Sequence, residues 1–340
     1  MKYVYVLTST ENDFYYEQFF MSAVSLKERI SKAEIVLLCD FNTEKTLSEN
    51  RRGYEKIVSQ IIPVKTPENM LQVEISRWIR TSMRRFVKGD FLFLDGDTIV
   101  AEDLSSVAGL NIGFGACLDS HTTIDRHANR ERFIKNDKKL GFNSHLSNRQ
   151  YNGGVLFCAD LPQTYKIFDR WHELWLFGKS KNTIRDQPSL NMAIFENSSC
   201  FTELDGTWNC QIVSNYLPYI SGAKIFHYFA TNSQLQSSPF LLASENIFKQ
   251  IKETGLIPGE AYKLIENPKA AFSPETRIIT DENIITVIDS DFFKLSFLLN
   301  KKMPKLFKLI NCLSSLIKNI TRSYFVRASR KKDGGIRFYN

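Results

Sequence analysis

The fold of this 340-residue chain is decided by one stretch, Phe91-Leu92-Phe93-Leu94-Asp95-Gly96-Asp97-Thr98. Its four large apolar residues, without alternation, predict a strand that is buried on both faces, as in a parallel sheet. Ligands of open α/β folds bind outside the carboxyl ends of such strands. We therefore expect Asp95 and Asp97 to face a ligand crevice, with the small Gly96 between them.

This pair of carboxylates indicates a metal site. Two carboxylates so close in the chain repel one another unless a positive charge lies between them, and a hard divalent cation supplies that charge. Mg²⁺ or Mn²⁺ held by one or two carboxylates keeps coordination positions open for the oxygens of a diphosphate. A second interpretation stays open at this point, because Asp-Gly is also a common turn that closes a β-hairpin.

The composition is ordinary for a soluble globular protein, with 43% hydrophobic and 24% charged residues. The charge is unevenly placed, however. Residues 294–340 contain 12 Lys or Arg and one acid, a net charge of +11, which leaves −4 for the first 293 residues of a chain whose total is +7. The basic character therefore belongs to the C-terminal tail, and no nucleic-acid partner is expected.

The cysteines and the N-terminus predict a cytoplasmic protein. The six cysteines are scattered without a CxxC pair, which favours small core residues in a reducing compartment. The apolar run after Lys2 is shorter than the roughly 7–15 residues of a signal peptide. Lysines interrupt the C-terminal apolar clusters, so no run reaches the roughly 18 apolar residues of a spanning helix.

The start of the chain predicts a βαβ unit. Two short apolar strands, Lys2–Leu7 and Glu34–Cys39, flank a segment whose apolar residues between 19 and 30 recur at spacings of four, three and four. Neither GxGxxG nor GxxxxGK[ST] is present, which removes the best signatures of dinucleotide oxidoreductases and P-loop enzymes. Any nucleotide must be held in another way.

Four later residues stand at the ends of predicted elements. Asn152, beside two glycines and a buried strand, could bond a sugar hydroxyl or belong to a plain turn. Asp186 is placed as a helix N-cap, and Gln187 follows in the first helical turn with its amide free. His227 follows a strand expected over residues 223–226, where it could complete a metal shell or be structural.

Two other segments allow a functional and an ordinary interpretation. Arg80 could pair with a phosphate or a carboxylate, but its segment also contains Arg77, Arg84 and Arg85, so a solvated face is the default explanation. Residues 122–149 are polar and without clear periodicity, as in an acceptor-facing flap or an ordinary mobile loop.

Taken together, these motifs resemble the retaining family 8 glycosyltransferases, which include glycogenin and bacterial lipooligosaccharide galactosyltransferases. The matching segments occur in the family's order: residues 76–80, 93–97, 115–119, 151–156, 186–191, 208–209 and 227–228. Each is weak alone, but seven in the right order and spacing identify the family over roughly residues 1 to 230.

The resemblance implies a fold and a division of the chain. The fold is a single Rossmann-like α/β domain of the A type of nucleotide-sugar transferases, with a mostly parallel sheet flanked by helices. We expect a catalytic domain over residues 1–245, a connecting segment over 246–293 and a basic amphipathic tail over 294–340.

The resemblance also implies roles for the residues that match. Asp95, Asp97 and His227 would hold Mn²⁺ (or Mg²⁺). The donor, a UDP-sugar, would be bound by seven residues: Thr8 and Ser9 at the uridine, then Arg80, Asp95, Gly96, Asp97 and Asp119. Asn152 would contact the donor sugar, and Asp186 with Gln187 would lie at the reacting face.

Two departures from the family's pattern put details of donor binding in question. Ser9 stands where the family usually has an acid after the first strand, with Glu11-Asn12-Asp13 displaced. After His227, the family's Gly and Lys-Pro-Trp are replaced by Ala230 and Ser237-Ser238-Pro239-Phe240, which lack the lysine.

The expected activity is transfer of a hexose from a UDP-sugar to a saccharide or glycolipid acceptor, with retention of configuration, in bacterial lipopolysaccharide or capsule synthesis. Two alternatives remain. A phosphatase of the haloacid dehalogenase type also uses an aspartate pair after an apolar strand, but its pair opens the chain. The other is a nucleotide-sugar-binding protein without turnover.

The tail predicts association with a membrane surface. From residue 306 to 320, seven Leu and Ile residues recur at spacings of three, one, three, three, one and three, so they line one face of a helix bordered by lysines. A basic amphipathic helix of this kind is suited to an anionic membrane surface, here the inner face of the membrane. Packing against the catalytic domain or a second subunit is the alternative.

Overall fold

The computed structural model describes residues 1–110, 112–213, 215–229, 240–270, 286–288 and 290–329. Side chains 108 and 318–329 are outside this description, as are two segments named above, residues 230–239 after His227 and residues 330–340 of the tail. The chain forms two compact units, Met1–Thr276 and Arg277–Asn340, which are described separately.

The first unit is built on a seven-stranded sheet with the order β3-β2-β1-β4-β7-β6-β8. Every neighbouring pair is parallel except the two that involve β7. The strands are β1 (Lys2–Leu7), β2 (Glu34–Cys39), β3 (Gln60–Pro63), β4 (Phe91–Leu94), β6 (Phe114–Leu118), β7 (Tyr151–Cys158) and β8 (Phe201–Leu204). The prediction of an α/β fold with a mostly parallel sheet is confirmed.

β4 lies in the middle of this sheet and is buried on both faces, as its unbroken apolar run predicts. Leu92 and Leu94 belong to one core cluster, and Phe91 and Phe93 belong to the other. The alternative of a hairpin at Asp95-Gly96 is wrong. The next strand, β5 (Thr98–Val100), leaves the sheet and pairs with β10 (Ile225–His227) in a second sheet of order β5-β10-β9, in which β9 is Cys210–Gln211.

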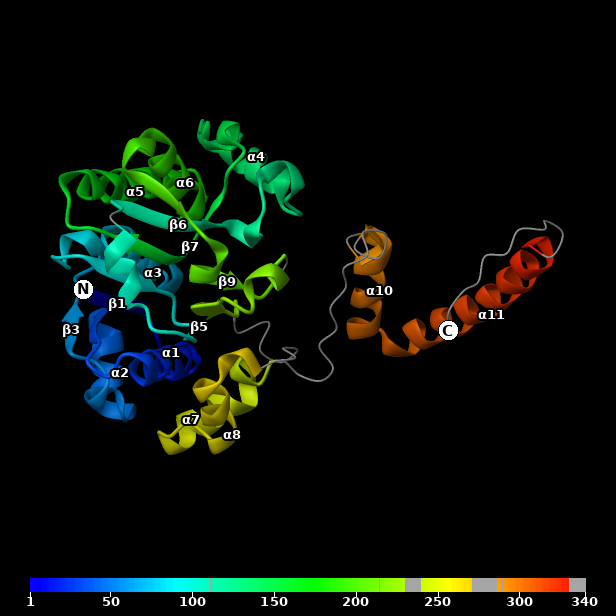
Figure 1. The fold of residues 1–340 in the computed structure, drawn as a ribbon, viewed down its shortest axis with the longest axis horizontal. Coiled ribbons are helices and arrows are strands. Elements are labelled where there is room, and N and C mark those ends of the chain that lie inside the picture. The colour runs from blue at the N-terminus through cyan, green and yellow to red at the C-terminus, as the bar shows by residue number, and fades with distance from the viewer. Residues whose placement is uncertain (111, 214, 230–239, 271–285, 289, 330–340) are drawn as a thin grey trace. The chain divides into compact units, whose positions relative to one another are not determined.

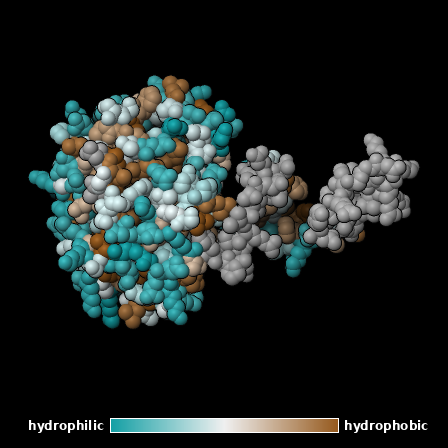
Figure 2. Space-filling model, in the orientation of Figure 1, coloured by the Kyte–Doolittle hydropathy of each residue, from teal (hydrophilic) through white to brown (hydrophobic). Residues whose placement is uncertain are grey.

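Helices cover both faces of the large sheet (Figure 1). One core cluster contains buried residues of α1 (Tyr15–Arg29), α2 (Phe41–Asn50), α7 (Glu245–Thr254) and α8 (Gly259–Glu266). The other contains buried residues of α3 (Gln72–Ser82), α5 (Pro162–Ser180) and α6 (Gln187–Glu196). On the face of this unit seen in Figure 2, hydrophobic residues occur only in small groups between hydrophilic ones.

A crevice forms where β1 and β4 end side by side. The two strands are parallel, and the next strands of this sheet along the chain lie on opposite sides of the pair, because β2 lies beside β1 whereas β6 lies on the far side of β4, beyond β7. This is a topological switch point, the position at which open α/β sheets bind ligands. Thr8 follows β1 and Asp95 follows β4, so both predicted site residues lie at this edge.

Three predicted boundaries differ from the observed ones. Asn152 and its two glycines lie inside β7 rather than before it. The polar stretch at 122–149 contains a helix, α4 (Arg130–Leu140), because Phe133 and Leu140 are buried beneath it. The strand expected over residues 223–226 is β10, Ile225–His227, so His227 is its last residue.

The first unit also extends beyond residue 245, where the sequence analysis placed the end of the catalytic domain. Ile247, Phe248 and Ile251 of α7 are fully buried in the core that α1 also enters. Arg29 of α1 donates hydrogen bonds of 2.8 Å to the carbonyl groups of Ile265 and Glu266 at the end of α8. These helices therefore belong to the first unit because they complete the apolar cover of one sheet face.

The second unit contains two amphipathic helices in contact with one another, α10 (Asp291–Lys302) and α11 (Pro304–Ser329). The Ser290 hydroxyl accepts the backbone N–H of Phe293 and so caps α10. Large apolar side chains of both helices are exposed, among them Phe297 and Leu309. Among the described helices, none is long and apolar enough to cross a membrane.

The packing of α7 can be tested with two matched substitutions. Phe248→Ala is expected to lower the free energy of unfolding of the first unit by about 3–5 kcal/mol, because it leaves a cavity in the core. Phe297→Ala on α10, where the ring is 60% exposed, should change it by less than about 0.5 kcal/mol. Denaturant titration followed by tryptophan fluorescence measures both, since all four tryptophans lie in the first unit. Equal effects of the two substitutions would contradict the assignment of α7 to this core.

Candidate active site

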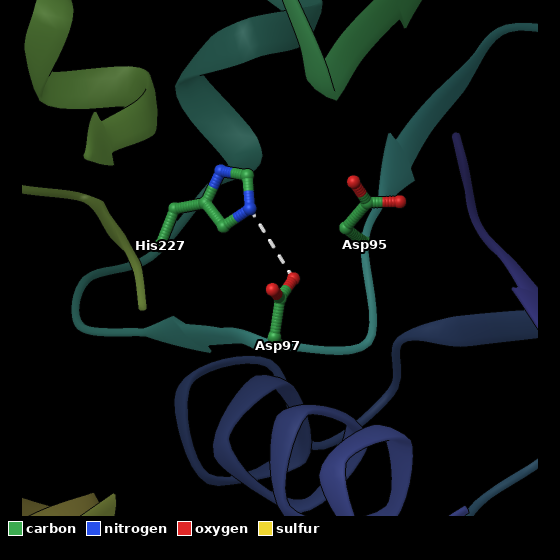
Figure 3. A group of neighbouring side chains, drawn as sticks. All are labelled: Asp95, Asp97 and His227. Carbon is green, nitrogen blue, oxygen red and sulfur yellow. Dashed lines mark ion pairs between the residues drawn. The ribbon is translucent and has the colours of Figure 1, made fainter. Parts of the chain in front are cut away.

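Three predicted metal ligands converge at the end of β4. Asp95 follows β4, Asp97 lies in the turn to β5, and His227 ends β10. The pairing of β5 with β10 places His227 opposite Thr98, and the backbone N–H of Tyr228 donates to the Asp97 carbonyl group at 3.0 Å. One ligand atom from each of the three side chains lies within 4.8 Å of the others, and His227 Nε2 is 3.2 Å from Asp97 Oδ1 (Figure 3).

The electrostatics of this cluster favour a bound cation. Burial raises the pKa of Asp95, although the positive charge of Arg80 opposes the change. A cation close to this carboxylate would stabilise its ionised form. Burial alone would lower the pKa of His227, but the carboxylate of Asp97 beside it raises that pKa above its ordinary value. Two carboxylate groups and one imidazole nitrogen are donors that Mn²⁺ and Mg²⁺ accept, and three ligands leave coordination positions for oxygens of a substrate. These residues therefore fit the predicted divalent cation.

Arg80 is a buried part of the site and does not lie on a solvated face. Its Nη2 atom donates to Asp95 Oδ2 at 3.3 Å and to the carbonyl group of Gly153. Its Nε atom lies 3.5 Å from Asp186 Oδ2. The guanidinium group thus contacts the ends of two strands and the start of α6.

Asp186 stands at the N-cap position of α6, as predicted, but its carboxylate makes no capping hydrogen bond. It pairs instead with Arg77 Nε at 3.1 Å and with Arg80. Burial alone would raise the pKa of Asp186, but the two guanidinium groups hold it below its ordinary value. Asp186 therefore remains ionised next to the cluster of metal ligands.

The two glycines of β7 leave space for the side chains around them. A Cβ on Gly153 would lie 2.9 Å from Arg80 Nη2. A Cβ on Gly154 would lie 2.7 Å from His227 Nδ1 and 2.9 Å from Asn152 Oδ1. Real Cβ atoms do not approach other atoms so closely. The sequence predicts close approach at these glycines, and the structure identifies Arg80 and His227 as the groups that approach.

Asp119, Asn152 and Gln187 form a second cluster beside the first. Asn152 Nδ2 donates to Asp119 Oδ1 at 2.9 Å, and the side-chain amide of Gln187 also donates to Asp119. Burial would raise the pKa of Asp119, but hydrogen bonds from His127, Asn152 and Gln187 lower it.

Asn191 is a positioning residue for this cluster whose role the sequence does not disclose. Its Oδ1 atom accepts the backbone N–H of Tyr151 at 2.7 Å, and its Nδ2 atom donates to the carbonyl groups of Tyr151 and Gln187 at 3.0 Å. This side-chain amide thus pairs with both the N–H and the carbonyl group of Tyr151, as the backbone of an adjacent strand would. It also holds the first turn of α6 through the Gln187 carbonyl group. In the sequence, Asn191 ends the matching segment 186–191 and lies one turn after Gln187, but these signals do not give its partners.

A cavity of about 300 Å³ extends from the end of β1 to the aspartate pair. Five of the seven residues predicted to bind the donor line it: Thr8, Arg80, Asp95, Gly96 and Asp97. The cavity is also lined by residues of α1 and α3 that the sequence analysis did not assign to donor binding, although two of them belong to the matching segment 76–80: Tyr15, Gln18, Gln72, Val73, Ser76 and Arg77.

Ser9 lies in the loop behind this cavity. Its side chain is buried, and its hydroxyl group donates to Asp13 Oδ1 at 2.7 Å. Asp13 also accepts from the Thr10 backbone N–H and from Gln72 Nε2. The displaced acid of this chain therefore holds the loop after β1 against α3.

The chain matches a known protein family, because the model described as Glycosyl transferase family 8 matches residues 15–232. Among solved structures, it is similar to the galactosyltransferase LgtC with donor and acceptor sugar analogues, at 16% identity over 77% of this chain and 99% of that one, with a TM-score of 0.46. It is similar to mouse xyloside xylosyltransferase 1 at 11% identity over 67% and 97% of the two chains, with a TM-score of 0.45.

A third similar structure is the glycosyltransferase GlyE of Streptococcus pneumoniae TIGR4, at 18% identity over 82% of this chain and 67% of that one, with a TM-score of 0.45. No curated protein sequence matches this chain significantly.

Gly154→Ala is expected to weaken binding of Mn²⁺ by about 10–100-fold, the usual cost of disturbing the support of a metal ligand. The added methyl group must displace the imidazole of His227. The matched control is Gly259→Ala at the start of α8, where a Cβ meets open space. Manganese titration followed by electron paramagnetic resonance measures both. Native affinity in the Gly154 variant would show that His227 does not need this close packing.

Proposed function

Because the chain belongs to glycosyl transferase family 8, we propose that it is a metal-dependent, retaining enzyme that transfers a hexose from a UDP-sugar to a saccharide acceptor. The observation that carries the proposal is the convergence of His227 with Asp95 and Asp97, the two carboxylates that line the cavity. Family membership removes the phosphatase alternative. A nucleotide-sugar-binding protein without turnover remains an outcome of the test below.

The cavity supports a donor that lies between β1 and the aspartate pair. Its volume of about 300 Å³ suits a nucleoside, and Tyr15 supplies an aromatic side chain at its wall. Arg77 and Arg80 pair with Asp95 and Asp186, whereas Asp97 lies 3.2 Å from His227. A divalent cation bound there would stabilise the negative charge on the leaving diphosphate as a Lewis acid.

The chain's own residues orient the reacting sugar. Asn152 uses its carbonyl oxygen and one N–H inside the protein, which leaves one N–H for a sugar hydroxyl. Gln187 interacts with Asp119 and starts α6, and its amide oxygen would stabilise the positive centre that develops as the glycosidic bond breaks. Asp186, held by Arg77 and Arg80, adds negative charge next to Gln187.

Transfer should depend on the aspartate pair. Asp95→Ala and Asp97→Ala are expected to lower turnover at least about 10²-fold without unfolding the protein, because each removes a metal ligand and charge stabilisation. EDTA should abolish transfer by the native enzyme. Asp103→Ala, which removes an exposed acid, is the control. The measurement is product formation from UDP-hexoses with Mn²⁺ on a panel of saccharide acceptors.

The same assay decides the stereochemistry. The product of a UDP-α-hexose should carry an α-linkage, and Gln187→Ala should lower turnover. A β-linkage found by NMR, or full activity in EDTA, would overturn the proposal. Tight binding of UDP-sugar with neither transfer nor hydrolysis would favour the binding protein instead.

We propose further that the second unit brings the enzyme to an anionic membrane surface, at the inner face of the membrane, where a glycolipid acceptor of lipopolysaccharide or capsule synthesis would lie. The exposed apolar residues of α11 between 306 and 317 share one face, and exposed lysines accompany them on both helices. The described side chains of this unit contain Lys294, Lys301, Lys302, Lys305 and Lys308 against the acid Asp291. Lysines near anionic headgroups contribute about 1 kcal/mol each.

A charge-matched pair of full-length variants tests this surface. Replacing Lys301, Lys302, Lys305 and Lys308 by Glu is expected to weaken sedimentation with anionic liposomes at least about 10²-fold at low salt. The control replaces four exposed lysines of the first unit, Lys56, Lys65, Lys88 and Lys166. Native protein that does not sediment with anionic liposomes, or equal losses in both variants, would rule the membrane surface out.

A further inference from the structure

A chain of polar side chains in contact with one another connects the metal-ligand cluster with residues 122–149, the segment that contains α4. His227 Nδ1 lies 3.0 Å from Asn209 Oδ1, and Asn209 Nδ2 donates to Asn152 Oδ1 at 3.0 Å. Asn152 Nδ2 donates to Asp119 Oδ1 at 2.9 Å, and Asp119 Oδ2 lies 3.2 Å from His127 Nε2. All five residues are buried, with 8% or less of each residue exposed. Because they are shielded from water, each polar atom depends on its neighbour in the chain.

One backbone group determines the direction of these hydrogen bonds. The N–H of Gly154, which can only donate, lies 2.8 Å from Asn152 and identifies the facing atom as Oδ1. Asn209 must therefore present its NH₂ group to that oxygen, and its own Oδ1 must face His227. A carbonyl oxygen accepts, so the proton of the neutral imidazole is on Nδ1. Nε2 is then the atom with a lone pair, and it faces Asp97.

The far end of the chain is determined in the same way. The backbone N–H of Asn129 donates to His127 Nδ1 at 2.9 Å, so the proton of that neutral imidazole is on Nε2, toward Asp119. The Asp119 carboxylate accepts from Asn152 and lies 3.2 Å from this Nε2 atom, so no two acceptor atoms face one another between His127 and His227. Each contact of this network therefore has one assigned donor and one assigned acceptor, and reversing any of them would bring two like atoms together.

We propose that Asn209 is a positioning residue that holds His227 as the Nδ1–H tautomer, with Nε2 free to bind the metal, and that Asn152 connects this ligand to Asp119. The inference rests on the proposed function because a metal ligand is what Asn209 positions. It assigns to Asn209 and Asn152 a role in orienting a ligand, in addition to the contact of Asn152 with the donor sugar. Partners of the second nitrogen of a ligating histidine usually set its tautomer and its affinity for the metal.

Two substitutions at one position separate the two bonds of Asn209. Asn209→Leu removes both, and Mn²⁺ should bind about 10–100-fold more weakly. Asn209→Asp keeps an acceptor for His227 but loses the donor to Asn152, so it should retain the Nδ1–H tautomer and most of the affinity. Asn197→Leu is the control, because it removes a side-chain amide that bonds only the Ala193 carbonyl group, away from the site.

The tautomer is measured without metal. In protein labelled with ¹⁵N-histidine, long-range ¹H–¹⁵N correlation at alkaline pH should show the proton of His227 on Nδ1, with the signal assigned by its loss in His227→Gln. In Asn209→Leu the signal should move toward the other tautomer or a mixture, and thermal unfolding shows that the variant is folded. Manganese affinity is then measured on the same samples.

The outcomes are distinct. An Nε2–H tautomer in the native protein, or native Mn²⁺ affinity in folded Asn209→Leu, overturns this inference even if transfer is metal-dependent. If Asn209→Leu does not fold, loss of the Nδ1–H tautomer in Asn209→Asp overturns it. A native protein that binds no Mn²⁺ overturns the proposed function, a failure that the metal-free spectrum keeps apart from failure of the hydrogen-bond assignment.

Discussion

The three elements that carry the candidate active site meet on one buried guanidinium group, that of Arg80. It contacts the carboxylate of Asp95 after β4, the carbonyl group of Gly153 in β7 and the carboxylate of Asp186 before α6. The ring of Phe93 lies 5.0 Å from its central carbon. A buried charge that loses a partner is costly, so the two strands and the helix are held in one arrangement. Every distance in the site depends on that arrangement.

The site residues lie where β7 extends beyond the end of its pairing with β4. The ladder between β4 and β7 extends from Phe91 and Cys158 to Leu94 and Val155, whereas β7 starts at Tyr151. Buried backbone groups still need partners in this overhang. Asn191 satisfies Tyr151, Arg80 satisfies the carbonyl group of Gly153, and the backbone of Asp95 satisfies that of Gly154. Polar side chains are therefore concentrated next to the cavity because the sheet ends there.

The same overhang brings distant parts of the chain to the metal ligands. Gly154 lacks a Cβ, so β10 can place His227 directly against β7. Asn209 then contacts both His227 and Asn152, and through Asp119 the contact reaches the segment that contains α4. The candidate metal ligand His227 and the carboxylate of Asp119 are thus connected by hydrogen bonds through Asn209 and Asn152.

The sequence by itself predicts the β4 strand, the ligand crevice at its end, the three candidate metal ligands and the family. Each depends on local patterns: an unbroken apolar run, a carboxylate pair, and motifs in a known order. Only the tertiary structure decides that Arg80 is buried, that Asp186 pairs with arginines instead of capping α6, that α7 completes the core, and that Asn191 and Asn209 position other groups. The reason is physical. Periodicity along a chain reports which side chains leave water, but the partner of a buried polar atom is set by strand register and by the crossing of elements that are far apart in sequence.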